Sequence, residues 1–323
     1  QEGINELGAT ASWLAAANSY SVNNQPMIPF FIYYSMFGFQ RVGDMMWAAG
    51  DQLARGFMVG GTSGRTTLNG EGLQHEDGHS HIQAGIIPNC VTYDPSFAFE
   101  VAVIMQDGIN RMYGEKQEDV FYYMTTLNEV MDQPAMPAGA EEGIRKGLYK
   151  FETVEGKKGK GHVQLLGSGA IMRHVREAAQ ILAKDYGVTS DVFSAPSFNE
   201  LAREGHDAAR WNLLHPTETQ RVPYVAQVLA DLPTVASTDY VKAYADQIRA
   251  FVPSRHYHVL GTDGFGRSDS RANLREHFEV DARYVVVAAL SQLAKEGTVS
   301  NQVVADAIAK FGLNVDRINP LYA

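Results

Sequence analysis

The hydrophobic and polar positions of this chain alternate between two kinds of segment, and the pattern predicts an α/β protein. Short runs rich in β-branched and aromatic residues are separated by longer runs in which apolar residues recur at helical spacing. Such alternation is typical of mainly parallel sheets flanked by helices. In the first half we expect strands at residues 27–34, 56–59, 86–92 and 120–126, and helices at residues 9–19, 40–54 and 96–113.

The second half continues in the same way and ends in helices. Asp281 and Ser300 stand where helix N-caps are expected, and Gly297 and Gly312 stand where helices end. The expected strands are residues 147–153, 163–166, 191–194 and 257–261, and the expected helices are residues 170–186, 282–296 and 301–311.

The helical and the strand spacing of apolar residues are both interrupted at one place, which divides the chain. Residues 132–139 contain two prolines and a glycine, which interrupt helices and strands alike. A length of 323 residues also favours two domains over one. We therefore expect a first domain at residues 1–135 and a second domain at residues 136–323, each a mainly parallel sheet flanked by helices.

Composition narrows the classes of function. A formal net charge of −10 without a basic stripe argues against nucleic acid as a partner. No apolar run approaches the ~20 residues that a membrane span requires, and no signal peptide opens the sequence. With one cysteine, Cys90, no internal disulfide can form, which favours a reducing, cytoplasmic compartment. Since the chain begins with Gln1, we expect it to be a piece of a longer protein.

The stretch with the densest candidate chemistry is residues 64–83. It has no helical or strand period, and a connection of this length between apolar runs is more often a binding or catalytic site than a spacer. A solvated polar loop and a zinc site are the alternatives, but Gly78 argues against the helix that a zinc-binding histidine pair would need. Acid–base or substrate-orienting histidines are favoured. The stretch contains His75, His79, His81, Glu76, Asp77, Gly70, Gly72 and Gly78.

Three segments resemble the homodimeric bacterial pyruvate dehydrogenase E1 family, which depends on thiamine diphosphate. They are residues 28–41 (Ile-Pro-Phe-Phe-Ile-Tyr-Tyr-Ser-Met-Phe-Gly-Phe-Gln-Arg), residues 60–83 and residues 260–270 (Leu-Gly-Thr-Asp-Gly-Phe-Gly-Arg-Ser-Asp-Ser). The likeness extends along essentially the whole chain. It implies that residues 1–135 are most of a pyrimidine-binding domain, truncated at its amino end, and that residues 136–323 are a transketolase-like C-terminal domain.

The resemblance implies an activity and partners. The activity is oxidative decarboxylation of pyruvate with reductive acetylation of a lipoyl group, within a cytoplasmic multienzyme complex of glycolytic metabolism. The partners are a second copy of the chain and the lipoyl domain of dihydrolipoyl acetyltransferase (E2). Pyruvate itself rests on the family likeness, because a longer 2-oxo acid would need only a slightly larger pocket.

The resemblance also assigns residues that hold the cofactor. Glu6 falls where the family keeps a glutamate that contacts N1′ of the aminopyrimidine; a carboxyl group shielded from water has a raised pKa and can share a proton there. Phe37 falls where an aromatic ring stacks on the aminopyrimidine, and Tyr34 and Arg41 would line the same pocket. Without the family, Glu6 is an acid in the first turn of a helix and the aromatic rings are core residues.

Substrate-facing residues follow from the same likeness. His75 matches an active-site histidine that serves as a proton donor or acceptor during acetyl transfer. Asp77 and His81 fall in a Glu-Asp-Gly-x-x-His pattern that also resembles transketolases, where they would either line the substrate pocket or orient the loop. His79 has no assigned role.

One motif of the superfamily is missing. No Gly-Asp-Gly followed by Asn-Asn occurs in the sequence, and that motif supplies oxygen ligands to the Mg²⁺ that holds the diphosphate. We therefore expect Mg²⁺ to be bound by a domain absent from this chain, no metal site within it, and no activity of the isolated 323 residues. The alternatives are a small subunit of a split 2-oxo acid dehydrogenase and a catalytically silent dimerisation or assembly module.

Overall fold

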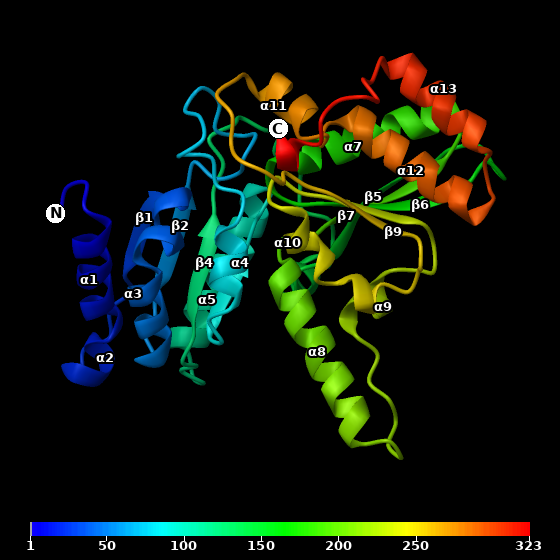
Figure 1. The fold of residues 1–323 in the computed structure, drawn as a ribbon. Helices are drawn as coiled ribbons and strands as arrows, with labels where there is room; N and C mark the ends of the chain where they lie inside the picture. Colours follow the sequence, from blue (N-terminus) through cyan, green and yellow to red (C-terminus); the bar gives the residue numbers. More distant parts are fainter. Residues whose placement is uncertain (1) are drawn as a thin grey trace.

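The computed structural model describes residues 2–323, which form two sheets that follow one another along the chain (Figure 1). The first sheet has four parallel strands in the order β1-β2-β4-β3. The second has five strands in the order β5-β7-β6-β8-β9, and its edge strand β5 is antiparallel to β7. Two mainly parallel sheets flanked by helices were predicted, and this fold class is confirmed. The strands are β1 Phe30–Tyr34, β2 Phe57–Gly61, β3 Cys90–Tyr93, β4 Phe121–Thr125, β5 Tyr149–Val154, β6 His162–Gly167, β7 Thr189–Ser194, β8 Thr234–Ser237 and β9 Tyr257–Leu260.

Helices cover both faces of each sheet. The α-helices are α1 Glu6–Ala17, α2 Ser19–Val22, α3 Phe39–Asp51, α4 Ser80–Gly85, α5 Ala98–Tyr113, α6 Glu141–Lys146, α7 Met172–Ile181, α8 Phe198–Leu214, α9 Tyr224–Val228, α10 Lys242–Asp246, α11 Arg271–His277, α12 Ala282–Glu296 and α13 Asn301–Phe311. Short 3-10 turns are η1 Ser35–Phe37, η2 Gly169–Ile171, η4 Arg249–Phe251 and η5 Pro320–Tyr322, and η3 Leu182–Tyr186 is a π-helical turn.

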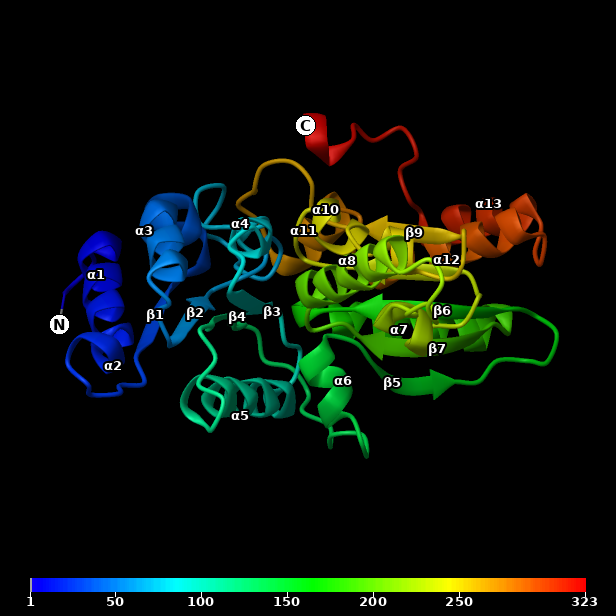
Figure 2. The ribbon, with the colours of Figure 1, turned by 90° about the horizontal axis from the view of Figure 1, so that it is seen from below.

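In the first unit, α1, α3 and α4 pack on one face of the sheet and α5 packs on the other (Figure 2). The first face buries Trp13 of α1, whose indole Nε1 donates to the carbonyl of Phe57 at 3.1 Å. The second face buries Ile104 and Met112 of α5 against β2 and β4. In the second unit, α7 and α12 cover one face, and α8, α9 and α10 cover the other.

Several expected elements differ from those observed. The expected strand at 86–92 begins only at Cys90, because α4 and a turn occupy residues 80–89. The expected helix at 170–186 is divided into η2, α7 and the π-helical turn η3. Strand β8 and helix α8 were not predicted. β8 is only four residues long and fully buried, so it has no alternation of polar and apolar positions to detect.

The predicted helix ends near the C-terminus are confirmed. The Asp281 side chain accepts hydrogen bonds from the backbone N–H groups of Arg283 and Tyr284 and so caps α12. Gly297 and Gly312 end α12 and α13 with positive φ angles of 92° and 63°, which glycine adopts without strain.

Buried carboxylates join the two units. Asp239, which follows β8, accepts hydrogen bonds from the hydroxyls of Thr66 and Thr67 at 2.6 Å each, on the segment that follows β2. Asp94, which follows β3, accepts from Ser168 of the second unit and Thr125 of the first at 2.8 Å each. Burial raises the pKa of Asp94 to about 7 although both hydroxyls favour its charged form.

A third link uses arginines. The Glu129 carboxylate, in the chain that leads out of the first sheet, pairs with Arg275 of α11, and its Oε1 lies 2.6 Å from Nη1 of Arg173. The side chains of Glu129 and Arg275 are 9% and 4% exposed, so this pair is shielded from water. Within residues 2–323, no helix combines the length and apolar character needed to cross a membrane.

We expect Glu129→Gln to lower the free energy of unfolding by about 3 kcal/mol at pH 7, because it leaves Arg275 buried without its countercharge. Burial alone would raise the pKa of Glu129, but the hydrogen bond and charge of Arg275, with Arg173 and Arg271, lower it. The contribution of Glu129 to the free energy of unfolding is therefore present above the unfolded-state pKa of about 4.3. It is lost as pH falls through the lower folded-state pKa. Urea unfolding at pH 7 and at pH 4 measures both effects.

The matched control is Glu142→Gln. Glu142 pairs with Lys146 on the surface of α6 at 2.8 Å, where water screens the interaction. This variant should unfold at the wild-type urea concentration. If Glu129→Gln does the same, the arginine cluster does not hold the two units together.

Candidate active site

The candidate site lies at the carboxyl ends of β1 and β2, where parallel sheets commonly bind ligands. β1 ends at Tyr34, and the chain turns through η1 into α3. The turn is tight at Gly38: a Cβ there would lie 2.0 Å from the Tyr33 ring, so a larger residue cannot be accommodated. β2 ends at Gly61 and is followed by an aperiodic loop, residues 62–79, which contains His75.

Three rings from these two segments meet. The Phe37 and His75 rings are 5.0 Å apart between centroids and nearly perpendicular, at 74°. The Tyr34 ring lies 5.8 Å from that of His75 and 6.1 Å from that of Phe37. Edge-to-face contacts of this kind fix ring orientation, so the imidazole is held against an aromatic shelf.

A charged pair completes the group. Its two residues come from two further segments, α3 and α1. Nη1 of Arg41, in α3, lies 3.2 Å from Oε1 of Glu6, the first residue of α1. The guanidinium carbon of Arg41 also lies 4.2 Å from the centre of the Phe37 ring. The Glu6 side chain is 19% exposed and that of Arg41 is 54% exposed, so the carboxylate is sheltered while the arginine is free to move.

The structure thus brings together five of the seven residues expected at the site: Glu6, Tyr34, Phe37, Arg41 and His75.

A neighbour of His75 was missed by the sequence analysis. Oε2 of Glu71 lies 3.8 Å from Nδ1 of His75. Gly72 then turns the chain with a φ of 86°, and the backbone N–H of His75 donates to its carbonyl at 3.1 Å. The four-residue spacing of an acid and a histidine was visible in the sequence, but without a helix it gave no reason to expect contact.

Asp77 and His81 are not part of this group. The Asp77 carboxylate is buried and accepts the backbone N–H groups of His79 and Ser80 at 2.9 Å, and the Ser80 hydroxyl as well, so it holds the first turn of α4. This placement supports the loop-orienting role rather than contact with substrate.

His81 is a core residue between the two units. Its ring stacks on Tyr244 at 4.8 Å and meets Tyr240 at 4.7 Å, while Nε2 lies 3.1 Å from the Thr125 hydroxyl. Burial lowers the pKa of His81 to about 4, so the imidazole is neutral at physiological pH.

The three histidines of the loop do not converge. Nε2 of His79 lies 2.6 Å from Oε1 of Gln40, away from His75 and His81. In the part of the chain that the structure describes, no group of three or more histidine, cysteine, aspartate or glutamate side chains is arranged to hold a metal ion. Cys90 is fully buried in β3, where burial raises the pKa of its thiol, and this agrees with the expectation of a packed thiol.

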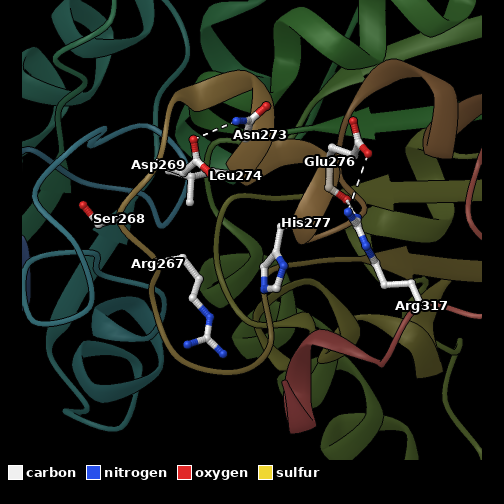
Figure 3. Close-up of a pocket in the computed structure, with 8 residues that line it drawn as sticks. All are labelled: Arg267, Ser268, Asp269, Asn273, Leu274, Glu276, His277 and Arg317. Carbon is white, nitrogen blue, oxygen red and sulfur yellow. Dashed lines mark hydrogen bonds and ion pairs between the residues drawn. The ribbon is translucent and has the colours of Figure 1, made fainter.

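The second unit supports the loop from the far side. In Figure 1, the loop after β2 and the segment before α11 lie side by side at the top of the molecule. The backbone N–H of Gly70 donates to the Asp269 carbonyl at 3.1 Å, and that of Val241 donates to the Gly78 carbonyl at 2.8 Å. The other side of the segment lines a surface cavity of about 470 Å³, into which Arg267 and His277 project (Figure 3).

Glu6, Phe37 and His75 together offer the contacts that a flat, basic heteroaromatic ring would require. Glu6 supplies a carboxylate that can exchange a proton with a ring nitrogen, and Phe37 supplies an aromatic face for stacking. His75 supplies a second proton-transfer group beside them. The residues present therefore fit one end of a cofactor such as thiamine diphosphate.

Comparisons with known proteins identify the family and the fold. Residues 1–134 match the model of the pyruvate dehydrogenase E1 component middle domain, and residues 147–281 match that of the transketolase-like C-terminal domain. A transketolase structure from Campylobacter jejuni aligns with a TM-score of 0.63 at 16% identity, covering 86% of this chain and 38% of its own. A structure described as a split-gene transketolase, inactive β4 tetramer, aligns with a TM-score of 0.58 at 15% identity, covering 90% and 82%.

Sequence identity to a known protein is much higher than the 16% and 15% found with these two structures. The pyruvate dehydrogenase E1 component of Haemophilus influenzae is 99% identical over all 323 residues. The chain spans 36% of the length of that relative. The chain therefore belongs to the pyruvate dehydrogenase E1 component family, with a match to its middle domain followed by a match to a transketolase-like C-terminal domain.

Proposed function

We propose that this segment forms one side of the active site of an E1 enzyme that oxidatively decarboxylates pyruvate and acetylates a lipoyl group. The observation that carries the proposal is the convergence of Glu6, Arg41, Phe37, Tyr34 and His75 from separate segments onto one open surface. The near-identical relative supports pyruvate as the substrate. We place the boundary between the pyrimidine-binding and C-terminal domains at residues 135/136, in a stretch without helix or strand.

Thiamine diphosphate, when bound, would supply the electron sink for decarboxylation. Glu6 would hold a proton at the aminopyrimidine, and Phe37 would stack on that ring. Arg41 now contacts both Glu6 and Phe37. Because its side chain is 54% exposed, Arg41 can move aside and leave the carboxylate for the cofactor.

His75 would act later, in transfer of the acetyl group. Its imidazole is held by Tyr34 and Phe37 and lies 3.8 Å from the carboxylate of Glu71. The two aromatic rings set the orientation of the imidazole, and the Glu71 carboxylate, beyond hydrogen-bond distance, would attract the ring when it is protonated. The oriented ring can donate a proton to the departing lipoyl sulfur.

The other side of the site would come from residues that this segment lacks. Mg²⁺ and the diphosphate require oxygen ligands and phosphate-binding backbone that were not found in the sequence. We propose that the isolated segment is inactive and that the whole enzyme is a homodimer, which works with the lipoyl domain of E2 in a cytoplasmic complex. The inactive β4 tetramer of a split-gene transketolase, with which this chain shares its fold, keeps a split-subunit arrangement as the second candidate.

Glu6→Gln, introduced into a full-length protein that carries this segment, should lower pyruvate turnover by about 100-fold or more, because a proton-transfer group is lost. Thiamine diphosphate should still bind, as measured by calorimetry, since stacking on Phe37 remains. Glu115→Gln, at an exposed residue after α5, is the control and should retain wild-type turnover. Turnover of Glu6→Gln within twofold of wild type would contradict the role of Glu6.

His75→Ala should separate the two half-reactions. We expect acetylation of a free lipoyl domain to fall by about 100-fold, while pyruvate oxidation with an artificial electron acceptor falls by less than fivefold, because the proton is needed at the sulfur. An equal fall in both assays would assign His75 to decarboxylation instead.

The isolated 323-residue chain should give no turnover with pyruvate, thiamine diphosphate and Mg²⁺. Adding a separately produced polypeptide with the remainder of a full-length relative should restore it, because the open surface would then be enclosed. Turnover by the homogeneous chain alone, verified by intact mass, would overturn the half-site proposal.

A further inference from the structure

Glu76 is a buried acid for which the proposed function gives no role. It follows His75 directly, and its side chain is 0% exposed. Its Oε2 accepts the backbone N–H of Arg267 at 2.7 Å, whereas its Oε1 is buried without a hydrogen-bond partner. A buried acceptor left unpaired is costly and calls for an explanation.

The contact with the second unit is close. A Cβ placed on Gly266 would lie 2.6 Å from Oε2 of Glu76 and 3.1 Å from Cα of Leu73, so the backbone of 266–267 fits directly against the loop. The other links between the loop and the second unit include Gly70 to Asp269 and Val241 to Gly78, which join backbone to backbone. Among the loop's links to segment 261–270, that of Glu76 uses a titratable side chain and lies next to His75 in sequence.

His75 and Glu76 contact opposite surroundings. The His75 ring meets Phe37 and Tyr34 on the open surface, whereas the Glu76 carboxyl meets the segment before α11. Because the two residues share one peptide unit, a displacement of the Glu76 backbone must also displace His75. A shift of about 1 Å in a catalytic group can cost on the order of 100-fold in rate.

We propose that Glu76 is a positioning residue that fixes His75 by anchoring the loop to the backbone of Arg267. The inference rests on the proposed role of His75 and names the residue that sets its placement. Burial disfavours the ionised carboxyl at this contact, whereas the N–H of Arg267 favours it.

Burial and some of the surrounding groups shift the pKa of Glu76 in opposite directions. Burial raises the pKa of Glu76 to about 7; the backbone hydrogen bond from Arg267 lowers it, Asp239 raises it, and Arg65 lowers it. Arg65 itself is engaged, because Nη1 donates to the carbonyls of Thr262 and Gly264. The charged groups that face this region are Arg65, Asp77, Asp239 and Asp263.

Because burial raises the pKa of Glu76 to about 7, the anchored loop holds its proton more tightly than a released loop would. The free energy that anchors the loop therefore falls as pH rises from a released-state pKa of about 4.3 to about 7, and it is constant above that pH. Glutamine has the shape of the neutral acid and does not titrate, so Glu76→Gln should keep lipoyl acetylation within about twofold of wild type at pH 6.5. It should also remove the loss of anchoring that wild type shows as pH rises to 7. Glu76→Ala should lower acetylation by about 10- to 100-fold with a smaller change in the KM for pyruvate.

The experiment uses the full-length enzyme and measures the pH profiles of wild type, Glu76→Gln, Glu76→Ala and the control Glu155→Gln, an exposed acid in the β5–β6 loop. Hydrogen–deuterium exchange of residues 70–79 is measured on the same samples. Faster exchange there in Glu76→Ala at pH 6.5, and a ratio of wild-type to Glu76→Gln exchange that rises between pH 5 and pH 7.5, support the proposal. Exchange reports the anchor even if wild type shows no pyruvate activity, an outcome that would instead refute the proposed function.

Two results would overturn the inference. One is identical exchange of residues 70–79 in wild type and Glu76→Gln throughout pH 5 to pH 7.5. The other is a Glu76→Ala variant with wild-type acetylation and exchange. Should Glu76→Ala fail to fold, the comparison of wild type with Glu76→Gln decides alone.

Discussion

Buried carboxylates between the two sheets constrain the rest of this structure. Taking a carboxylate out of water is costly unless its oxygens are hydrogen-bonded or paired with a cation. Asp239 meets this requirement with Thr66 and Thr67, and Glu129 with Arg275. Since each of these pairs joins one unit to the other, the sheets cannot move apart without breaking these hydrogen bonds and this ion pair. The loop that holds His75 is built on this junction.

Much of the fold could be predicted from the sequence because the spacing of its apolar residues is clear. Helix α12 is capped by Asp281, α12 and α13 end at glycines, and β1, β2 and β4 are apolar runs between breaks. Helix α8 was missed although Ser197 caps it, whereas two other missed elements have weak local signals. β8 is a buried strand of four residues, and α4 begins beside a glycine-rich loop, where the Asp77 carboxylate rather than a periodic pattern determines the first turn.

The candidate site was predictable only in part, for a physical reason. Glu6, Phe37 and His75 could be assigned through their resemblance to a family, but nothing in their spacing shows that Arg41 bridges the first two. Glu71 and Glu76 lie on either side of His75 and face different surroundings, one the open surface and the other the second unit. Which of two nearby acids is exposed depends on tertiary packing, in particular on segment 261–270, almost 200 residues further along the chain.

The links that hold the loop have a consequence for sequence variation. Beside side-chain links such as Asp239 to Thr66, the second unit contributes main-chain atoms at three points: the N–H of Val241, the N–H of Arg267 and the carbonyl of Asp269. Every amino acid presents the same carbonyl, and every one except proline presents the same N–H. The side chains at 241, 267 and 269 can therefore change without loss of these three bonds, with proline excluded at 241 and 267. Substitution at these three positions would leave this part of the backbone framework intact.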